Sequence, residues 1–202
     1  MFVGYPGKRL IDLSVVIIAA PIWVPLLAIV AAAVRLRIGA PVFFRQERPG
    51  LRGQPFELVK FRSMTVAVAA DGSPLPDAMR ITPFGRRLRS TSLDEIPEIL
   101  NVLRGEMSLV GPRPLLPRYL SRYSERHRRR HDVRPGLTGL AQVSGRNALT
   151  WTAKFDLDVE YVERCSLRLD VAILWRTVRA VFSRHGINAA GEATMREFTG
   201  YD

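Results

Sequence analysis

The chain has 202 residues, a formal net charge of +11 and one cysteine, Cys165, which excludes an internal disulfide and fits a reducing compartment. The only lysines are Lys8, Lys60 and Lys154, so arginine carries nearly all of the positive charge. Because guanidinium groups bind phosphate oxygens bidentately, we expect a phosphate-bearing partner: nucleic acid, anionic lipid head groups or a phosphorylated substrate.

An apolar segment, residues 13–34, lies near the start of the chain. It is long enough for a helix that crosses the hydrocarbon core of a bilayer. It is also longer than the apolar region of a signal peptide, and no small-residue cleavage site follows it. We therefore expect a segment that is retained and bound to a membrane.

Two prolines, Pro21 and Pro25, interrupt this segment, and a proline inside a helix removes a backbone donor and tends to kink the helix. Basic residues flank both ends of the segment, and basic flanks favour the cytoplasmic side. A helix that breaks at Ala20-Pro21 and turns back would keep both flanks on that side. A spanning helix and a re-entrant one both remain open from these residues alone.

Short strands are predicted next, at residues 41–44 and 56–61, with a turn between them at 48–53, and together they form a hairpin. Residues 70–78 are rich in Gly, Pro and Asp and predict a loop.

The rest of the chain is predicted to be mainly helical. Ile96, Ile99, Leu100 and Leu103 follow the spacing of an amphipathic helix, which Gly105 is placed to end. The further elements that we expect are an extended link at 111–114, a basic helix at 115–130, a loop at 134–139, and helices at 155–163 and 171–182. The fold class is therefore α+β, mainly helical, with a small β-hairpin.

The last of these helices allows two interpretations. Its apolar residues, Val171, Leu174, Trp175, Val178 and Phe182, share one face, and arginines lie nearby. The face either packs on the core, or it lies on anionic lipid as an interfacial helix.

The densest group of residues with chemical potential is at 82–97, where Asp94 and Glu95 follow a cluster of arginines. Glu95 has a structural alternative, because Ser92 and Glu95 match a capping box at a helix start, which Pro97 places near residues 92–94. Asp94 is less easily explained by capping, since the arginines would keep it ionised and would also hold a phosphoryl group against it.

A carboxylate beside arginines suits covalent phosphoryl transfer, in which an acyl phosphate forms and passes its phosphoryl group onward. Arg86, Arg89 and Arg113 are candidate phosphate ligands, and Asp94 is also a candidate ligand of Mg²⁺, which commonly takes one or two carboxylates plus substrate phosphates. The sequence contains no Walker loop, dinucleotide glycine fingerprint or zinc-ligand spacing.

The three histidines, His127, His131 and His185, lie in arginine-rich surroundings and are predicted to be on the surface. The run at 126–131 has few aromatic stacking partners, so we expect a solvated or lipid-facing basic helix and no nucleic-acid partner.

Six motifs follow one another in a fixed order and resemble the bacterial sugar transferases, the monotopic polyprenol-phosphate phosphoglycosyl transferases. They are KFRSM at 60–64, SLDE at 92–95, NVLRGEMS at 101–108, VGPRP at 110–114, RPGLTG at 134–139 and AQVSGRN at 141–147. The resemblance covers essentially the whole chain, at the length of the small members that contain only the catalytic domain. It implies a membrane element at residues 1–38 and a cytoplasmic phosphoglycosyl transferase domain at 39–202.

The resemblance implies a ping-pong reaction. Asp94 attacks the β-phosphorus of a UDP-sugar and releases UMP, and undecaprenyl phosphate then takes the phosphosugar from Asp94. Asp94 and Glu95 correspond to the catalytic dyad of the family, with Mg²⁺ at the aspartate. Lys60, Arg89, Arg113 and Asp158 fall on positions that members of the family use in the active site, with Asp156 two residues from Asp158 as the alternative match. The tail at 186–198 resembles members that use N-acetylated amino sugars, while transfer of a hexose 1-phosphate stays open.

The resemblance also implies a re-entrant helix-break-helix at the cytoplasmic face of the bacterial inner membrane, with anionic lipid as a partner. The break is commonly Ser-Pro, whereas here it is Ala20-Pro21, and Glu98 stands where glutamine is common. Two other functions compete with this one: a membrane-anchored protein that only binds nucleic acid or anionic lipid, and a metal-dependent lipid phosphatase. The sequence does not indicate an oligomeric state.

Overall fold

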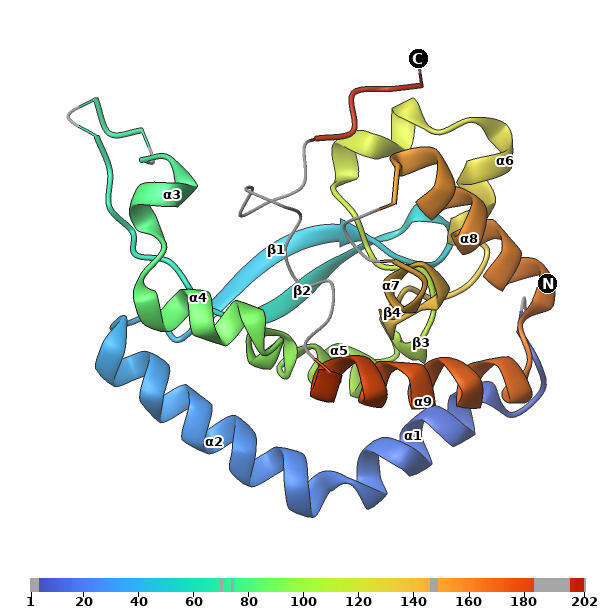
Figure 1. Ribbon diagram of the computed structural model, residues 1–202, viewed down its shortest axis with the longest axis horizontal. Helices are drawn as coiled ribbons and strands as arrows, with labels where there is room; N and C mark the ends of the chain where they lie inside the picture. The colour runs from blue at the N-terminus through green and yellow to red at the C-terminus, as the bar shows by residue number, and fades with distance from the viewer. Residues whose placement is uncertain (1–3, 70, 74, 146–148, 184–196, 202) are drawn as a thin grey trace.

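The computed structural model describes residues 4–69, 71–73, 75–145, 149–183 and 197–201, which form helices around two small sheets (Figure 1). The predicted class, mainly helical with a small β-hairpin, is confirmed. The α-helices are α1 Lys8–Ile18, α2 Ala20–Arg37, α3 Asp77–Arg80, α4 Pro83–Ser90, α5 Glu98–Arg104, α6 Glu125–Arg128, α7 Leu140–Val143, α8 Trp151–Arg164 and α9 Leu167–Ser183. The 3₁₀ turns are η1 Leu51–Gly53, η2 Leu93–Glu95, η3 Pro117–Arg122 and η4 Arg129–His131. The strands are β1 Phe43–Pro49, β2 Pro55–Phe61, β3 Ser108–Val110 and β4 Gly136–Thr138.

The apolar segment is broken into two helices, α1 and α2, which meet at Ala19 beside the predicted Ala20-Pro21 break. Pro21 lies in the first turn of α2. Backbone N–H groups in the first turn make no hydrogen bond within the helix, so a proline is tolerated there. The indole Nε1 of Trp23 donates to the carbonyl of Val16 at 2.8 Å, so this side chain satisfies a backbone group at the break. The second proline, Pro25, lies inside α2, which continues past it.

Of the helices that the structure describes, α2 alone is long and apolar enough to cross a membrane, judged by length and composition. Both helices of the broken segment nevertheless pack against the globular part. Val16 of α1 shares a core with Phe56 and Val102, and Val34 of α2 shares a second core with Phe61.

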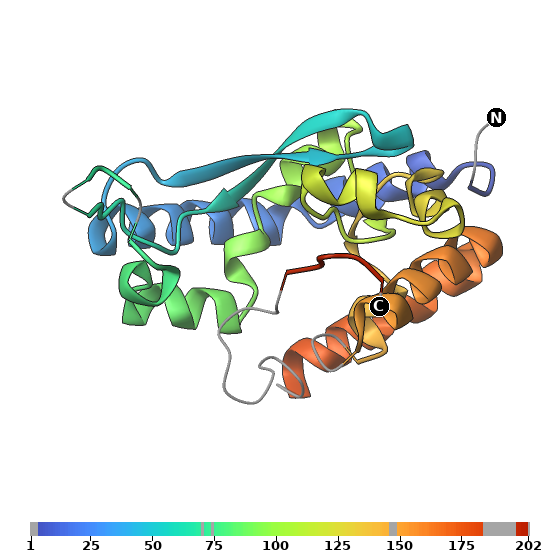
Figure 2. The ribbon, with the colours of Figure 1, turned by 90° about the horizontal axis from the view of Figure 1, so that it is seen from above.

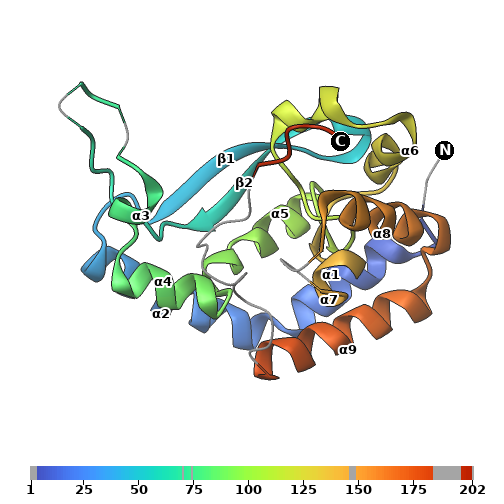
Figure 3. The same cartoon turned by 45° about the horizontal axis from the view of Figure 1, so that its top comes forward.

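Strands β1 and β2 form the predicted antiparallel hairpin, with Phe44 opposite Lys60 and Arg48 opposite Phe56. The first strand is longer than predicted, and the turn falls at residues 50–54. Helix α5 lies between this hairpin and α1 (Figure 3). The buried Asn101 of α5 joins it to the hairpin, because its side-chain amide accepts from the Val59 N–H and donates to the Glu57 carbonyl.

The hairpin and α9 lie at opposite edges of the molecule when it is seen from above (Figure 2). Helix α5 ends at Gly105, as predicted, in the left-handed conformation (φ 86°) that favours glycine. Beyond it, β3 pairs in parallel with β4, so the loop predicted at 134–139 contains a short strand.

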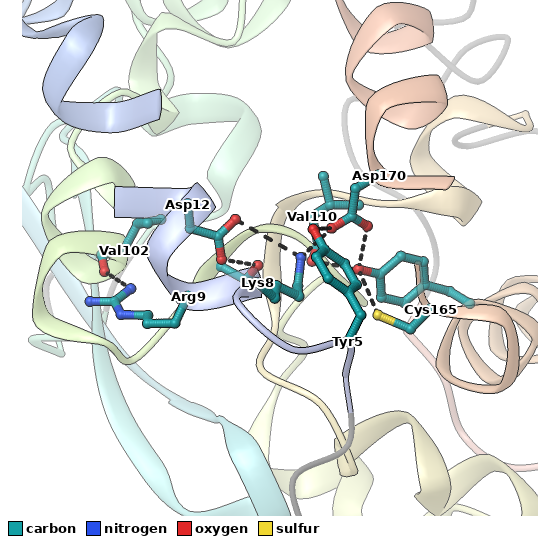
Figure 4. Close-up of polar contacts among 10 residues, drawn as sticks. Tyr5, Lys8, Arg9, Asp12, Val102, Val110, Cys165 and Asp170 are labelled. Carbon is teal, nitrogen blue, oxygen red and sulfur yellow. Dashed lines mark hydrogen bonds and ion pairs between the residues drawn. The ribbon is translucent and has the colours of Figure 1, made fainter. Parts of the chain in front are cut away.

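A buried polar network ties α1 to β3 and α9 (Figure 4). The Lys8 Nζ and an Asp170 carboxylate oxygen are 2.5 Å apart, and the Tyr161 hydroxyl donates to the other Asp170 oxygen at 2.7 Å. On the next turn of α1, Asp12 accepts a 2.7 Å hydrogen bond from the Ser108 hydroxyl. The side chains of these charged residues are largely buried, so breaking the network would leave buried charges without partners. The network therefore attaches α1 firmly to the globular part.

Two sequence predictions for the basic region are wrong. Residues 115–130 do not form one helix, because extended backbone at Tyr123 and Ser124 separates η3 from α6, which Ser124 caps. His127 and His131 are buried, not on the surface. His127 contacts Tyr201 and Asp156, and His131 contacts the Gly50 carbonyl. Burial lowers the pKa of His131 to about 4, so this imidazole is neutral at pH 7. His185 lies outside the described residues.

The exposure of the side chains on α9, the last predicted helix, bears on its two interpretations, which are packing on the core and lying on lipid. Trp175 is 70% exposed, and Val171 and Val178 are each more than half exposed, whereas Ile173 is fully buried. Among the described residues this predicted face is therefore divided: Leu174 packs against the core that contains Ile173, whereas Val171, Trp175 and Val178 are exposed. The side chain of Phe182 is outside the part that the structure describes.

Candidate active site

Strand β2, turn η2 and helix α5 bring one lysine and two glutamates together. The Lys60 Nζ lies 2.8 Å from Glu95 and 2.9 Å from Glu98. Lys60 points to this site because it is on the same face of β2 as Phe56 and Leu58, two residues of the core. Glu98 is 1% exposed, and burial raises its pKa even though Lys60 opposes the shift.

Arg113, on the extended link after β3, holds Glu95 from another side. Its Nη1 donates to Glu95 Oε2 at 3.2 Å, and its Nη2 donates to Glu95 Oε1, so the contact is bidentate. Burial alone would raise the pKa of Glu95, but the charges of Arg113 and Lys60 outweigh it and hold this pKa well below its usual range. Glu95 is therefore ionised and committed to two cations.

Asp94 is in a different position from its neighbour. Its residue surface is only 8% exposed, yet among the described residues no hydrogen-bond or ion-pair partner of its carboxylate is seen. Burial and the adjacent Glu95 raise the pKa of Asp94 to about 6, while Lys60, Arg113 and Arg89 favour its charged form. The site thus presents one uncommitted carboxylate, surrounded by positive charge and mostly ionised at pH 7.

Ser92 and Glu95, the residues of the predicted capping box, do not cap a helix in the structure. Ser92 has a left-handed conformation (φ 56°), and neither its hydroxyl nor the Glu95 carboxylate makes a capping hydrogen bond. The capping-box interpretation of these residues is therefore wrong. The helix itself starts later than expected, at Glu98, with Pro97 as the preceding residue.

The two arginines of α4 that the sequence singled out lie differently. The Arg89 Nε donates to the Ser63 hydroxyl at 2.8 Å, and the charge of Arg89 acts on Asp94. Arg86 lies on the exposed side of α4, and its guanidinium contacts the Ile81 carbonyl at 3.4 Å. The structure therefore brings Arg89 to the cluster and leaves Arg86 outside it.

Asp158 reaches the site through Arg130. Its Oδ2 accepts from Arg130 Nε at 3.0 Å and from Nη2 at 2.7 Å, and both side chains are almost fully buried. The same Nη2 donates to the Arg113 carbonyl at 2.7 Å. The pair of Arg130 and Asp158 thus helps to hold the backbone of Arg113 in position. A direct contact of Asp158 with a substrate stays a prediction.

A metal ion has one suitable place among the described residues. These residues contain no cluster of three or more acidic, histidine or cysteine side chains that would form a protein-only site. Mg²⁺, however, is often held by one or two carboxylates together with the substrate's own phosphates. The uncommitted oxygens of Asp94 fit that requirement, whereas Glu95 is already paired with Arg113 and Lys60.

The sequence model of the family "Bacterial sugar transferase" matches residues 4–184, which include every residue of the cluster. The chain belongs to the bacterial sugar transferase family.

Several relatives match this bacterial sugar transferase over most of their length. It is 51% identical over 193 residues to the uncharacterized sugar transferase EpsL of Bacillus subtilis, with 96% of each chain covered. It is 40% identical over 188 residues to a UDP-glucose:undecaprenyl-phosphate glucose-1-phosphate transferase of Caulobacter vibrioides, covering 87% of this chain and 70% of the relative. It is 35% identical over 201 residues to the exopolysaccharide production protein ExoY of Sinorhizobium fredii, covering 91% and 89%.

The sequence did not reveal two residues that shape the site of this sugar transferase. In the sequence Glu98 differs only by standing where glutamine is common, whereas in the structure it forms an ion pair with Lys60. Arg130 belongs to the run at 126–131 that the sequence predicts to be solvated or lipid-facing, whereas in the structure it is only 2% exposed. The position of Glu98, about one helical turn after Asp94 and Glu95, indicates in the sequence that it could lie on the same side as they do. For Arg130, nothing in a run of arginines indicates which one turns inward.

Proposed function

We propose that this protein transfers a sugar 1-phosphate from a UDP-sugar to undecaprenyl phosphate, and so starts the assembly of a membrane-linked polysaccharide. Family membership and the names of the relatives support the general reaction. The observation that carries the mechanism is the carboxylate of Asp94, buried among cations yet without a partner in the described structure.

The proposed reaction has two displacements. An oxygen of Asp94 attacks the β-phosphorus of the UDP-sugar, the bond from that phosphorus to the bridging oxygen breaks, and UMP leaves with the bonding electron pair. The phosphate oxygen of undecaprenyl phosphate then attacks the same phosphorus. The bond to Asp94 breaks, and the carboxylate is regenerated together with a polyprenyl diphosphate sugar.

The charged residues around Asp94 have separate roles in this proposal. Arg113 and Lys60 supply positive charge for the phosphoryl oxygens, and Glu95 holds both in place by the contacts described above. Arg89, whose visible partner is a hydroxyl and not a carboxylate, has its remaining N–H groups available for phosphate. Mg²⁺, bound to Asp94 and substrate phosphates, would neutralise further negative charge.

The proposal includes two classes of sugar donor. The resemblance of the tail at 186–198 favours an N-acetylated amino sugar, but most of that tail lies outside the described residues. The relative from Caulobacter is named for transfer of glucose 1-phosphate. A screen with both types of donor therefore forms part of the test.

The test is UMP release by the purified full-length protein in detergent or nanodiscs, measured with UDP-glucose and with UDP-N-acetylglucosamine. We expect UMP from at least one donor, one phosphosugar per protein without acceptor, and full turnover when undecaprenyl phosphate is added. EDTA should abolish release, and added Mg²⁺ should restore it. No UMP from any UDP-sugar would favour the lipid- or nucleic-acid-binding alternative, and free phosphate from lipid phosphates would favour a phosphatase.

We further propose that α1 and α2 form a re-entrant element at the cytoplasmic face of the bacterial inner membrane. The two helices meet at an apex that points away from the globular part (Figure 1), and Ile17, Ile18 and Ile22 near this apex are more than 60% exposed. The outer end of each helix is attached to the same globular part. Arg9 of α1 donates to the Val102 and Leu103 carbonyls, and Arg62 donates to the Ile38 carbonyl after α2.

This attachment argues against a spanning helix, since ends that bind the same domain lie on the same side of the bilayer. At about 1.5 Å per residue, α1 is about 16 Å long, far shorter than the hydrocarbon core of about 30 Å, whereas α2, at about 27 Å, is close to that thickness. The attachment of both ends, and not the length of α2, therefore favours a re-entrant element. The exposed Trp175, Val171 and Val178 of α9, with Arg176 and Arg179 beside them, would rest on anionic lipid next to α1.

Thiol labelling in cells tests this topology. In a Cys165→Ser background, the exposed positions of Pro6→Cys and Ser121→Cys report on the N-terminal end and on the globular domain. We expect a membrane-impermeant maleimide to label neither site in intact spheroplasts and both sites after lysis. Labelling of the Pro6→Cys variant alone in intact spheroplasts would mean that the segment crosses the membrane.

A further inference from the structure

A fourth cation faces the site from the hairpin. Arg48 of β1 is opposite Phe56 of β2, and Phe44 of β1 is opposite Lys60 of β2. The two pairs are separated by four residues, an even number, along each strand. Because side chains alternate between the two faces of a strand, Arg48 and Lys60 project from the same face of the hairpin. Burial lowers the pKa of Arg48 to about 10, and Arg113 adds to the shift by repulsion, which places the two guanidinium groups near each other.

Arg48 has no anionic partner in the part of the chain that the structure describes. Its Nη2 donates to the Gln46 side-chain carbonyl at 2.6 Å, and its Nε is enclosed with no acceptor. No carboxylate lies within ion-pair distance of it among these residues, whereas Lys60, Arg113 and Arg130 each have one.

The usual structural uses of a buried arginine do not account for this one. Arg9, Arg62 and Arg134 donate to the backbone carbonyls of Val102, Ile38 and Gly105. In the described structure Arg48 donates to no backbone carbonyl, and its one acceptor there is the neutral side chain of Gln46, two residues before it on the same strand. A half-buried guanidinium with no counter-ion among the described residues is costly, and an anion bound beside Arg113 would offset that cost.

We propose that Arg48 is a substrate-binding residue that contacts phosphate oxygens together with Arg113, and that Gln46 holds its guanidinium in place. This inference rests on the proposed function, because two substrates of that reaction carry phosphate: the diphosphate of the UDP-sugar and the phosphate of the polyprenyl acceptor. In either case the bound anion completes the charge balance that Arg48 lacks.

The experiment compares Arg48→Gln and Arg48→Lys with a matched control, Arg45→Gln. Arg45 lies on the same strand but on the opposite face, and its exposed side chain pairs with Glu57 at 2.6 Å. The probes are UDP, titrated into the full-length protein by calorimetry, and undecaprenyl phosphate in nanodiscs, added to the protein after it has been charged with the phosphosugar.

A charge-assisted hydrogen bond to phosphate corresponds to a change in affinity of roughly 10- to 150-fold. If Arg48 binds the nucleotide, the Kd of UDP should rise by that factor in Arg48→Gln, less in Arg48→Lys, and not in Arg45→Gln. If it binds the acceptor, the Kd of UDP stays unchanged and the KM for undecaprenyl phosphate in the second half-reaction rises instead.

The inference is overturned when both constants in the Arg48 variants equal those of Arg45→Gln. Should Arg48→Gln fail to fold, Arg48→Lys decides in the same way: raised constants support the proposal, and unchanged ones overturn it. A wild-type protein that neither binds UDP nor releases UMP would instead refute the proposed function itself, and that result is distinct from any difference between variants.

Discussion

Replacement of Asp94 by asparagine is expected to lower sugar-phosphate transfer by at least roughly 10⁴-fold, the order of loss seen when a member of a covalent catalytic group is removed. Asparagine keeps the size of the side chain but not the negative oxygen that attacks phosphorus. Since no hydrogen bond or ion pair of this carboxylate is seen among the described residues, the change should leave the fold intact. The measurement is UMP release under saturating UDP-sugar.

The same variant gives a second, independent readout. With UDP-sugar and no acceptor, the wild-type protein should gain the mass of one phosphosugar on the peptide that contains Asp94, and the Asp94→Asn protein should gain none. Asp77→Asn is a suitable control, because Asp77 is exposed and pairs only locally with Arg80. Substantial activity in Asp94→Asn, or an adduct on another residue, would refute the covalent mechanism.

The second large effect is expected on stability. Asp158→Asn leaves Arg130 as a buried cation without its counter-ion, and breaking such a pair from one side typically costs about 3–5 kcal/mol. Because Arg130 also donates to the Arg113 carbonyl, activity should fall as well. Thermal or denaturant unfolding of the protein in detergent measures the loss of stability.

The matched control for this variant is Glu160→Gln on the same helix, α8. Glu160 pairs with Arg164 on the exposed side of the helix, and such a surface pair contributes about 0.5 kcal/mol or less. A stable Asp158→Asn protein that has lost affinity for UDP would mean that Asp158 contacts the substrate directly, as the family resemblance implies, and does not act through Arg130.

The parts of the fold that follow from local patterns were predictable. The hairpin, the helix that ends at Gly105 and the break beside Pro21 each depend on a few neighbouring residues and on the periodicity of apolar ones. The pairing of β3 with β4 was not, because two three-residue strands that join distant parts of the chain leave almost no local signal.

For the site, the ordered motifs identified Asp94, Glu95, Lys60 and Arg113, and the structure brings these four together. What could not be predicted depends on tertiary contacts of residues that look alike in the sequence. Arg130 turns inward to Asp158 while its neighbours Arg128 and Arg129 stay exposed, and His127 is buried by Asp156 and Tyr201. Arg48 joins the site because of the strand register, which fixes the face on which it lies.

The attachment of both α1 and α2 to the globular part has a consequence for the membrane in which the protein works. A spanning helix must match the thickness of the bilayer at two surfaces, and a mismatch is relieved by tilting or by deforming the lipid. An apex that ends inside the hydrocarbon layer has only one surface to match. In the proposed re-entrant topology Arg9 and Arg62 hold the outer ends of the two helices, so the protein, and not the length of the acyl chains, would set the depth of Asp94 relative to the head groups. Activity in nanodiscs should therefore change little between lipids of different chain length.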